Sequence, residues 1–174
     1  MSYLILKIFS PFFLFSGLSA KTSSAETFLL STAAIANLTF MEASVVPLLK
    51  NYNTAKILVN AVNQQQQGSS KTSNNNKGHY PKEINQNNPL TVSIYIQDQV
   101  AAVLANMAAN ADCRCEVVKH GGVPLLLHFL MAQIPNIKKN NTNNSNSPEL
   151  KPEDYAQMAA TERVLQKSAI AISR

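Results

Sequence analysis

Two cysteines and two histidines lie near one another in the sequence, and zinc binding is the chemistry that such residues could perform. Cys113, Cys115, His120 and His128 have the spacing C-x-C-x4-H-x7-H, which fits no standard zinc finger. Structural zinc requires four converging ligands, and His128 lies within an apolar helical stretch. We therefore predict no metal site. The two cysteines are also too close for a mutual disulfide, which favours a reducing compartment.

Motifs of the common catalytic sites are absent from the sequence. It has no G-x-S-x-G, no H-E-x-x-H and no phosphate-binding glycine loop. The adjacent acids Glu153 and Asp154 lie on different faces of a helix, and they suit its first turn, where the helix dipole favours negative charge. We therefore predict a protein that is not an enzyme, binds no cofactor and has no small-molecule substrate.

The positive charge of the chain is spread out rather than gathered. The 174 residues carry a formal net charge of +5, and the basic residues are scattered without interleaved aromatic side chains. Nucleic-acid binding needs a clustered basic surface, so this class of ligand is disfavoured and an RNA-binding helical repeat is the weaker alternative. A mild positive balance fits solubility or the recognition of an acidic peptide.

An apolar leader occupies residues 1–21, before the patterned part of the chain at residues 22–174. Its apolar run, residues 8–18, is too short to cross a bilayer comfortably, so we predict no stable membrane span. Lys7, the apolar run and the small residues after it are similar to a secretory signal peptide. Two interpretations stay open, namely a signal peptide on a small secreted helical protein, or spurious sequence joined to a domain fragment.

Apolar residues at helical spacing predict an all-α chain. The first helix should begin at Ser23 and Glu26, which have the spacing of a capping box. Residues 41–62 should form two short helices, because turn-forming residues interrupt the apolar pattern. Residues 110–112 should supply a turn and a helix N-cap. A last helix should begin at Pro152, with acidic residues in its first turn.

The segment 94–133 contains the clearest helix boundaries in the chain. We expect Gly121 and Gly122 to form a structural turn that stops a short helix, since glycine accepts the left-handed geometry found at helix C-termini. Pro124 should lie in the first turn of the next helix, where its missing N–H costs nothing. Residues 125–131 are apolar nearly all round, which predicts a buried helix.

Two low-complexity inserts, at residues 63–88 and 136–148, separate the apolar segments. They carry too little apolar surface to offset their ordering entropy, so we predict disordered loops. The phrase IANLT around Asn37 recurs as LANMA around Asn106, and IAISR, which ends at Arg174, lies at a third similar place. Without its insert of roughly 26 residues, the first interval of 69 positions leaves about 42 residues, within the period of armadillo and HEAT repeats.

The chain resembles the armadillo repeat family in LANMA, in the short helix after it and in HGGVPLLLHFL. The first repeat departs from the pattern, because it lacks the Gly-Gly pair and has a degenerate turn at residues 51–53. More narrowly, FLLSTAAIANLTF, YIQDQVAAVLANMAANADCRCEVVKHGGVPLLLHFL and ATERVLQKSAIAISR are similar to the C-terminal armadillo domain of the Inscuteable family. The implied fold is a partial armadillo-type α-solenoid of two to three repeats.

This resemblance implies a protein-binding scaffold or adaptor for cell polarity and for spindle orientation in asymmetric division, in the cytoplasm or at the cell cortex. Its partners would be polarity-complex components or peptide segments. Asn37 and Asn106 match the asparagine that lines the groove of peptide-binding armadillo proteins, where a side-chain amide can hold an extended backbone. The alternative role of an asparagine is local helix bonding. Arg174, at the third position, either favours an acidic ligand or is an exposed chain end.

Overall fold

The computed structural model describes residues 24–41, 43–68, 92–142 and 151–174, and within these ranges it contains helices and no strand. The prediction of an all-α chain is therefore confirmed, whereas the predicted leader at residues 1–21 lies outside the described residues. In chain order the helices are α2 (Ala25–Met41), the 3-10 helix η1 (Ala43–Val45), α3 (Val46–Asn51), α4 (Thr54–Gly68), α5 (Ile94–Ala109), α6 (Ala111–Lys119), α7 (Gly122–Thr142) and α8 (Pro152–Ile172).

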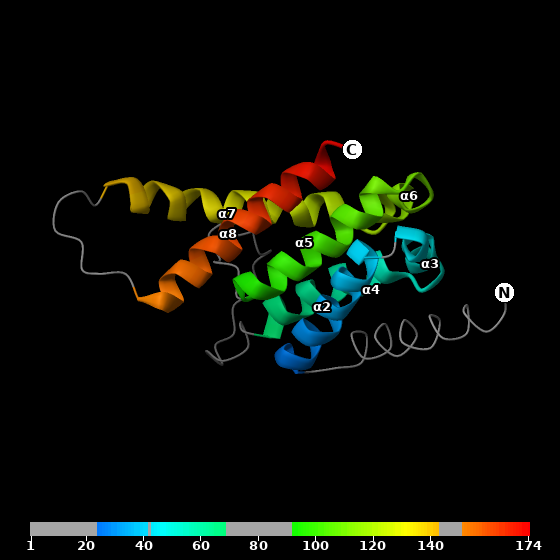
Figure 1. Cartoon of the computed structure of the whole chain (residues 1–174), viewed down its shortest axis with the longest axis horizontal. Helices are drawn as coiled ribbons and strands as arrows, with labels where there is room; N and C mark the ends of the chain where they lie inside the picture. The colour runs from blue at the N-terminus through cyan, green and yellow to red at the C-terminus, as the bar shows by residue number, and fades with distance from the viewer. Residues whose placement is uncertain (1–23, 42, 69–91, 143–150) are drawn as a thin grey trace, which may run out of the picture.

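Helix α5 lies at the centre of the arrangement. Figure 1 shows α2, α5 and α8 side by side and running in about the same direction, and α5 packs extensively against both of its neighbours. The short helix α3 contacts α6, and α4 contacts α7. Corresponding helices of two successive three-helix groups, α3–α5 and α6–α8, are therefore neighbours in space.

The hydrophobic core surrounds α5. Its residues Val100, Leu104 and Met107 are fully buried, as the apolar stripe of this helix predicts. The large side chains that pack around them come from α2, α3, α4 and α7, and they include Phe28, Ile35, Leu49, Leu58, Leu126 and Phe129. Burial of this apolar surface stabilises the packing of the helices against one another.

Polar caps set several helix boundaries. The predicted cap of the first helix was one residue too early, because Ser24 rather than Ser23 precedes α2, and its Oγ accepts a hydrogen bond of 3.4 Å from the backbone N of Thr27. Asn110 confirms the predicted turn between α5 and α6, since its Oδ1 accepts a bond of 3.0 Å from the N–H of Asp112. The last helix begins at Pro152, as predicted, and Asp154 accepts a bond of 3.1 Å from the backbone N of Lys151.

The turns before α4 and α7 use the same backbone conformation. Asn53 has a φ of 52° and Gly121 has a φ of 80°, and they are the positive-φ residues of the described part of the chain. This left-handed geometry suits glycine and is tolerated by asparagine. The two short helices expected within residues 41–62 are present as α3 and α4, and residues 51–53 join them.

The structure moves the edges of both predicted inserts. Helix α4 extends to Gly68 and helix α7 extends to Thr142, so each helix includes the first residues of an insert that we expected at residues 63–88 or 136–148. Glutamine is a good helix former, which lets α4 continue into its QQQQ run. The rest of the two inserts falls largely at residues 69–91 and 143–150, outside the described residues.

The expectation that residues 125–131 form a buried helix holds for only part of the segment. Leu125, Leu126 and Phe129 are buried, but Leu127 is 45% exposed and Met131 is 68% exposed. These two exposed residues are four positions apart and share one face of α7. Helices α4, α5, α6 and α8 all contact α7, yet the side chains of Leu127 and Met131 are left largely exposed.

The helices were also compared with the length and composition of a membrane span. Among the described residues, no single helix is long and apolar enough to cross a membrane. The helices at Ala25–Met41 and Ala43–Asn51 reach that length and apolar composition only when taken together, and they are bent by 116° relative to each other.

Candidate functional site

The layer formed by α2, α5 and α8 contains the three residues that the sequence placed in a groove. Asn37 is exposed on α2, Asn106 is half-buried on α5, and Arg174 is exposed just after α8. Arg174 forms no hydrogen bond or ion pair with any other described residue. The structure therefore places all three on adjacent elements but links Arg174 to neither asparagine.

Asn106 connects two helices of this layer. Its Nδ2 donates a hydrogen bond of 2.8 Å to Oγ1 of Thr39 in α2. The hydroxyl of Thr39 in turn lies 2.9 Å from the carbonyl oxygens of Ile35 and Ala36, so it has an acceptor for its proton. One amide donor of Asn106 is thus used inside the protein, which leaves the second donor and the carbonyl oxygen for another group.

The solvent-facing residues of the layer form a strip along α5 and another along α2. On α5, Tyr95 is exposed and Gln99, Ala102 and Asn106 are half-exposed. These positions are spaced by four, three and four residues, which places them on one helix face. Asn37 has exposed neighbours on α2, namely Leu30 and Met41 at the same kind of spacing. The layer therefore offers amides among small and apolar side chains.

A buried ion cluster joins α5 to α8, and the sequence reasoning missed it. Asp98 is 2% exposed, and its two carboxylate oxygens accept bonds of 2.9 Å from Nε of Arg163 and 2.7 Å from Nζ of Lys167. Arg163 and Lys167 are four residues apart on one face of α8, so both cations reach the same carboxylate. The available signals were a lone aspartate within an apolar helix and this cation spacing.

A chain of amides ties α7 to α5 in the same region. Nε2 of Gln133 donates a bond of 3.1 Å to Oε1 of Gln97, and Nε2 of Gln97 donates a bond of 2.8 Å to the carbonyl of Val92. Both glutamines are buried. Together with the ion cluster, these bonds give the buried Asp98 and Gln97 of α5 partners on α7 and α8.

The predicted turn residues lie between α6 and α7. Gly121 has a positive φ, and Gly122 is closely packed, since a Cβ at this position would lie 2.6 Å from Cγ1 of Val117 and 2.9 Å from its carbonyl oxygen. Pro124 lies in the first turn of α7. The turn therefore needs glycine at two successive positions, for two different reasons.

The cysteines and histidines considered for zinc have separate surroundings. Cys113 is buried with its Sγ 3.3 Å from the carbonyl of Val46, and burial raises the pKa of its thiol. Cys115 is exposed. His120 lies 3.0 Å from Glu116, and His128 is exposed on α7. Among the described residues, no three His, Cys, Asp or Glu side chains form a group that could hold a metal ion.

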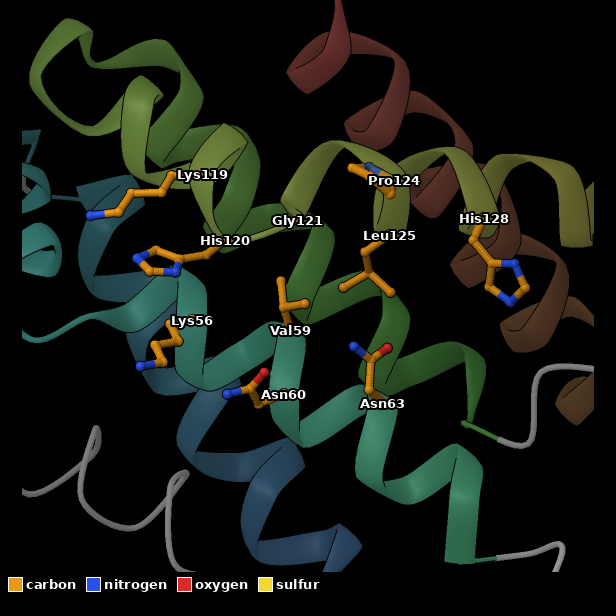
Figure 2. A pocket seen from close by; sticks show the side chains of 10 residues that line it. All are labelled: Lys56, Val59, Asn60, Asn63, Lys119, His120, Gly121, Pro124, Leu125 and His128. Atoms are coloured by element: carbon orange, nitrogen blue, oxygen red, sulfur yellow. The ribbon is translucent and has the colours of Figure 1, made fainter. Parts of the chain in front are cut away.

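A pocket of about 610 Å³ opens between α4 and the turn that joins α6 to α7 (Figure 2). Its walls are formed by Lys56, Val59, Asn60, Asn63, Lys119, His120, Gly121, Pro124, Leu125 and His128. The lining is basic, with amide and apolar groups beside the cations. The sequence reasoning did not predict it, because its two walls are about sixty positions apart in the chain and meet only through the packing of α4 against α6 and α7.

The chain was compared with known proteins. The sequence model of the family described as Protein inscuteable C-terminal matches residues 14–76 and 86–174. The chain is 27% identical over 157 residues to the Protein inscuteable homolog of Homo sapiens and, equally, to that of Mus musculus. Each match covers 90% of this chain and 20% of the relative, so the chain spans about a fifth of the length of these relatives. No solved structure matches it.

Proposed function

This chain belongs to the inscuteable C-terminal family, and on that premise we propose that it is a non-enzymatic, protein-binding adaptor in cell polarity and asymmetric division. Its role would be to hold a segment of another protein against the layer formed by α2, α5 and α8. The observation that carries this proposal is the side-by-side packing of these three helices, each of which ends one group of the internal repeat.

We propose further that the fold is a partial armadillo-type solenoid. In this interpretation α3–α5 and α6–α8 are two three-helix repeats, and α2 is the third helix of a repeat before them. Three features support it. Corresponding helices contact one another, the second helix of each group follows a positive-φ residue, and both inserts fall between the second and third helices. Insertions at one phase are what a solenoid tolerates, because each repeat contacts only its neighbours.

The chemistry of the layer suits an extended peptide. The free carbonyl oxygen and donor of Asn106, together with the exposed amide of Asn37, could bond to the N–H and C=O groups of a bound backbone. Exposed apolar side chains such as Leu30 and Tyr95 would then contact the side chains of the peptide. Arg174 would add a cation at the α8 end, where an acidic residue of the ligand would be favoured.

The partners of the whole protein are proposed on the same basis. A polarity adaptor would bind components of a cell-polarity complex in the cytoplasm or at the cell cortex, and it would help to orient the mitotic spindle. Because this chain corresponds to about a fifth of its relatives, it would contribute the contacts made by the helical layer and not the full set.

Peptide selection followed by binding measurements tests the proposed groove. Random peptides would be selected by display on the full 174-residue chain, and their affinities measured by fluorescence anisotropy. We expect Asn37→Ala to weaken the selected peptides by roughly fivefold or more, because two backbone bonds are lost. Asn51→Ala, which removes an exposed amide on α3 outside both proposed sites, is the matched control and should leave these affinities unchanged. Equal affinity for wild type and Asn37→Ala would overturn the proposed groove.

A further inference from the structure

The pocket between α4 and the α6–α7 turn is built from different helices than the proposed groove. None of its lining residues comes from α2, α5 or α8. They include two lysines, two histidines and two asparagines, and no carboxylate is among them. Its volume, about 610 Å³, is within the range of roughly 300–1,000 Å³ that ligand pockets have.

The polar groups of the pocket are divided between its two walls. Figure 2 shows Lys56, Lys119 and His120 gathered at one end, with the amides of Asn60 and Asn63 further along α4. Asn60 and Asn63 are three positions apart, so they share one helix face. The apolar part is formed by Val59 and Leu125, both 6% exposed, which lie between the basic end and the far end of the pocket.

The basic end is only partly neutralised. Glu116 lies 3.0 Å from Nε2 of His120 and 3.8 Å from Nζ of Lys119, and the second contact is loose because the lysine side chain is 68% exposed. Lys56 has no ion pair with any other described residue. Two lysines therefore face one carboxylate, and an excess of positive charge is left over an apolar floor. Such a surface attracts a negatively charged ligand.

We propose that this pocket is a second docking site, which binds an acidic segment of a partner protein. A carboxylate of the segment lies between Lys56 and Lys119, the two asparagines bond to its backbone, and a neighbouring apolar side chain packs on Val59 and Leu125. Charge complementarity identifies the occupant as acidic. A lining that alternates cations, amides and apolar groups fits a peptide better than a bare anion, since only a peptide uses all three.

The chain itself supplies no matching segment at the adjoining insert. Residues 69–91 contain Lys71, Lys77 and Lys82 against one acid, Glu83, so this insert is net positive and would be repelled by the basic end. The proposal therefore assigns the occupant to another protein rather than to this insert, and the site adds a contact that does not depend on the proposed groove.

Fluorescence anisotropy with a defined probe tests the second site. The probe is a fluorescein-labelled decapeptide in which glutamate alternates with leucine and serine, and the same peptide with lysine in place of glutamate is the matched control. We expect the full chain to bind the acidic peptide and not the basic one. Lys56→Glu should weaken binding roughly fivefold or more, because it replaces an attraction by a repulsion at the site. The double variant N60A/N63A should weaken it to a similar degree without altering net charge.

Two control measurements separate this site from other sources of binding. Lys151→Glu makes the same charge change at an exposed lysine outside the pocket and should leave the affinity within about twofold. Far-UV circular dichroism confirms that each variant folds. No binding of the acidic peptide overturns the proposal, and so does an equal loss in Lys56→Glu and Lys151→Glu. Vesicles containing phosphatidylserine that bind in a Lys56-dependent manner, while the peptide does not, would instead assign the pocket to a membrane surface and overturn it as well.

Discussion

Nε of Arg163 in α8 donates a hydrogen bond of 2.9 Å to Oδ2 of Asp98 in α5, 65 positions earlier in the chain. Lys167 binds the other oxygen of the same carboxylate. Asp98 is buried, whereas its two partners are partly exposed. Removing the cations would therefore leave a buried, unpaired carboxylate, whereas removing the carboxylate would leave cations that water can still reach. This asymmetry makes the docking of α8 on α5 sensitive to which partner is removed.

That asymmetry predicts which of two variants loses more stability. We expect the double variant R163M/K167M to lower the free energy of unfolding by about 3–5 kcal/mol, since it leaves a buried charge without a partner. Asp98→Asn should cost less, about 1–2 kcal/mol, because the released cations can be hydrated. Urea denaturation measures both losses, and Glu162→Gln, an exposed neighbour on α8, is the control. A larger loss for Asp98→Asn than for the double variant would contradict the stated cause.

The bond between Asn106 and Thr39 predicts a structural role for Thr39, whereas Asn37 has only the proposed binding role. Thr39→Val keeps the shape of the side chain but removes the acceptor for Nδ2 of Asn106, and we expect it to lower the free energy of unfolding by about 1–2 kcal/mol. Asn37→Ala, at an exposed position, should change stability by less than about 0.5 kcal/mol. Thermal melts compare the two variants. A stability loss in Asn37→Ala as large as that of Thr39→Val would show that Asn37 has a packing role.

The two positive-φ turns should respond to substitution in opposite directions. Asn53→Gly should raise the free energy of unfolding by up to about 1 kcal/mol, because glycine adopts a φ of 52° without strain. Gly121→Ala should lower it by about 1–2 kcal/mol for the same reason. Urea midpoints of the two single variants test this, with Asn51→Ala as an exposed neighbour in the control. A stabilising effect of Gly121→Ala would contradict the assigned conformation.

At Gly122 a larger side chain is excluded by a steric conflict with Val117, and shortening Val117 should not remove that conflict fully. An added Cβ would meet both Cγ1 and the carbonyl oxygen of Val117, so we expect Gly122→Ala to cost about 2–3 kcal/mol. Val117→Ala removes the side-chain contact but leaves the contact with the backbone. Relative to Val117→Ala, the double variant should therefore still lose stability in a urea denaturation, though less than Gly122→Ala loses relative to wild type, and full recovery would mean that the side chain alone causes the conflict.

The thiol of Cys113 makes stability depend on alkaline pH. Burial raises the pKa of this thiol in the folded chain, so above about pH 8.5 the unfolded chain loses the proton while the folded chain keeps it. The contribution to stability is therefore complete at neutral pH and is lost as the pH rises through the folded pKa. We expect Cys113→Ala to flatten this slope and Cys115→Ala, at an exposed thiol, to leave it unchanged. Urea midpoints between pH 7 and pH 10 measure both slopes, and equal slopes in the two variants would refute the assignment.

Local chemistry explains which parts of the fold could be predicted from the sequence. Asn110, Gly121 and Pro152 act through their own backbone and nearest neighbours, so their positions were predicted within the correct turns. The start of α2 was missed by one residue, because Ser23 and Ser24 offer nearly equivalent caps. The end of α4 was missed because glutamine favours helix without marking where a helix stops.

Features that depend on neighbours far along the chain could not be predicted in the same way. The periodicity of residues 125–131 shows that α7 is apolar, but it does not reveal that the packing of the other helices leaves Leu127 and Met131 exposed. In the sequence Asp98 is an isolated acid within an apolar helix, and its ion pairs with α8 depend on how the two helices pack. The pocket forms where α4 packs against the α6–α7 turn, so no local sequence motif predicts it.

Asn110 caps two helices at once, since its backbone N–H donates a bond of 3.1 Å to the carbonyl of Met107 in α5 while its side chain accepts from the backbone N–H of Asp112 in α6. The connection between these helices is the single residue Asn110, and both of its neighbours are already helical. A pull on α5 would therefore be transmitted directly to α6 and, through its end, to the wall of the basic pocket. The corner at Asn110 would therefore act as a rigid mechanical connection between α5 and the pocket wall that α6 forms.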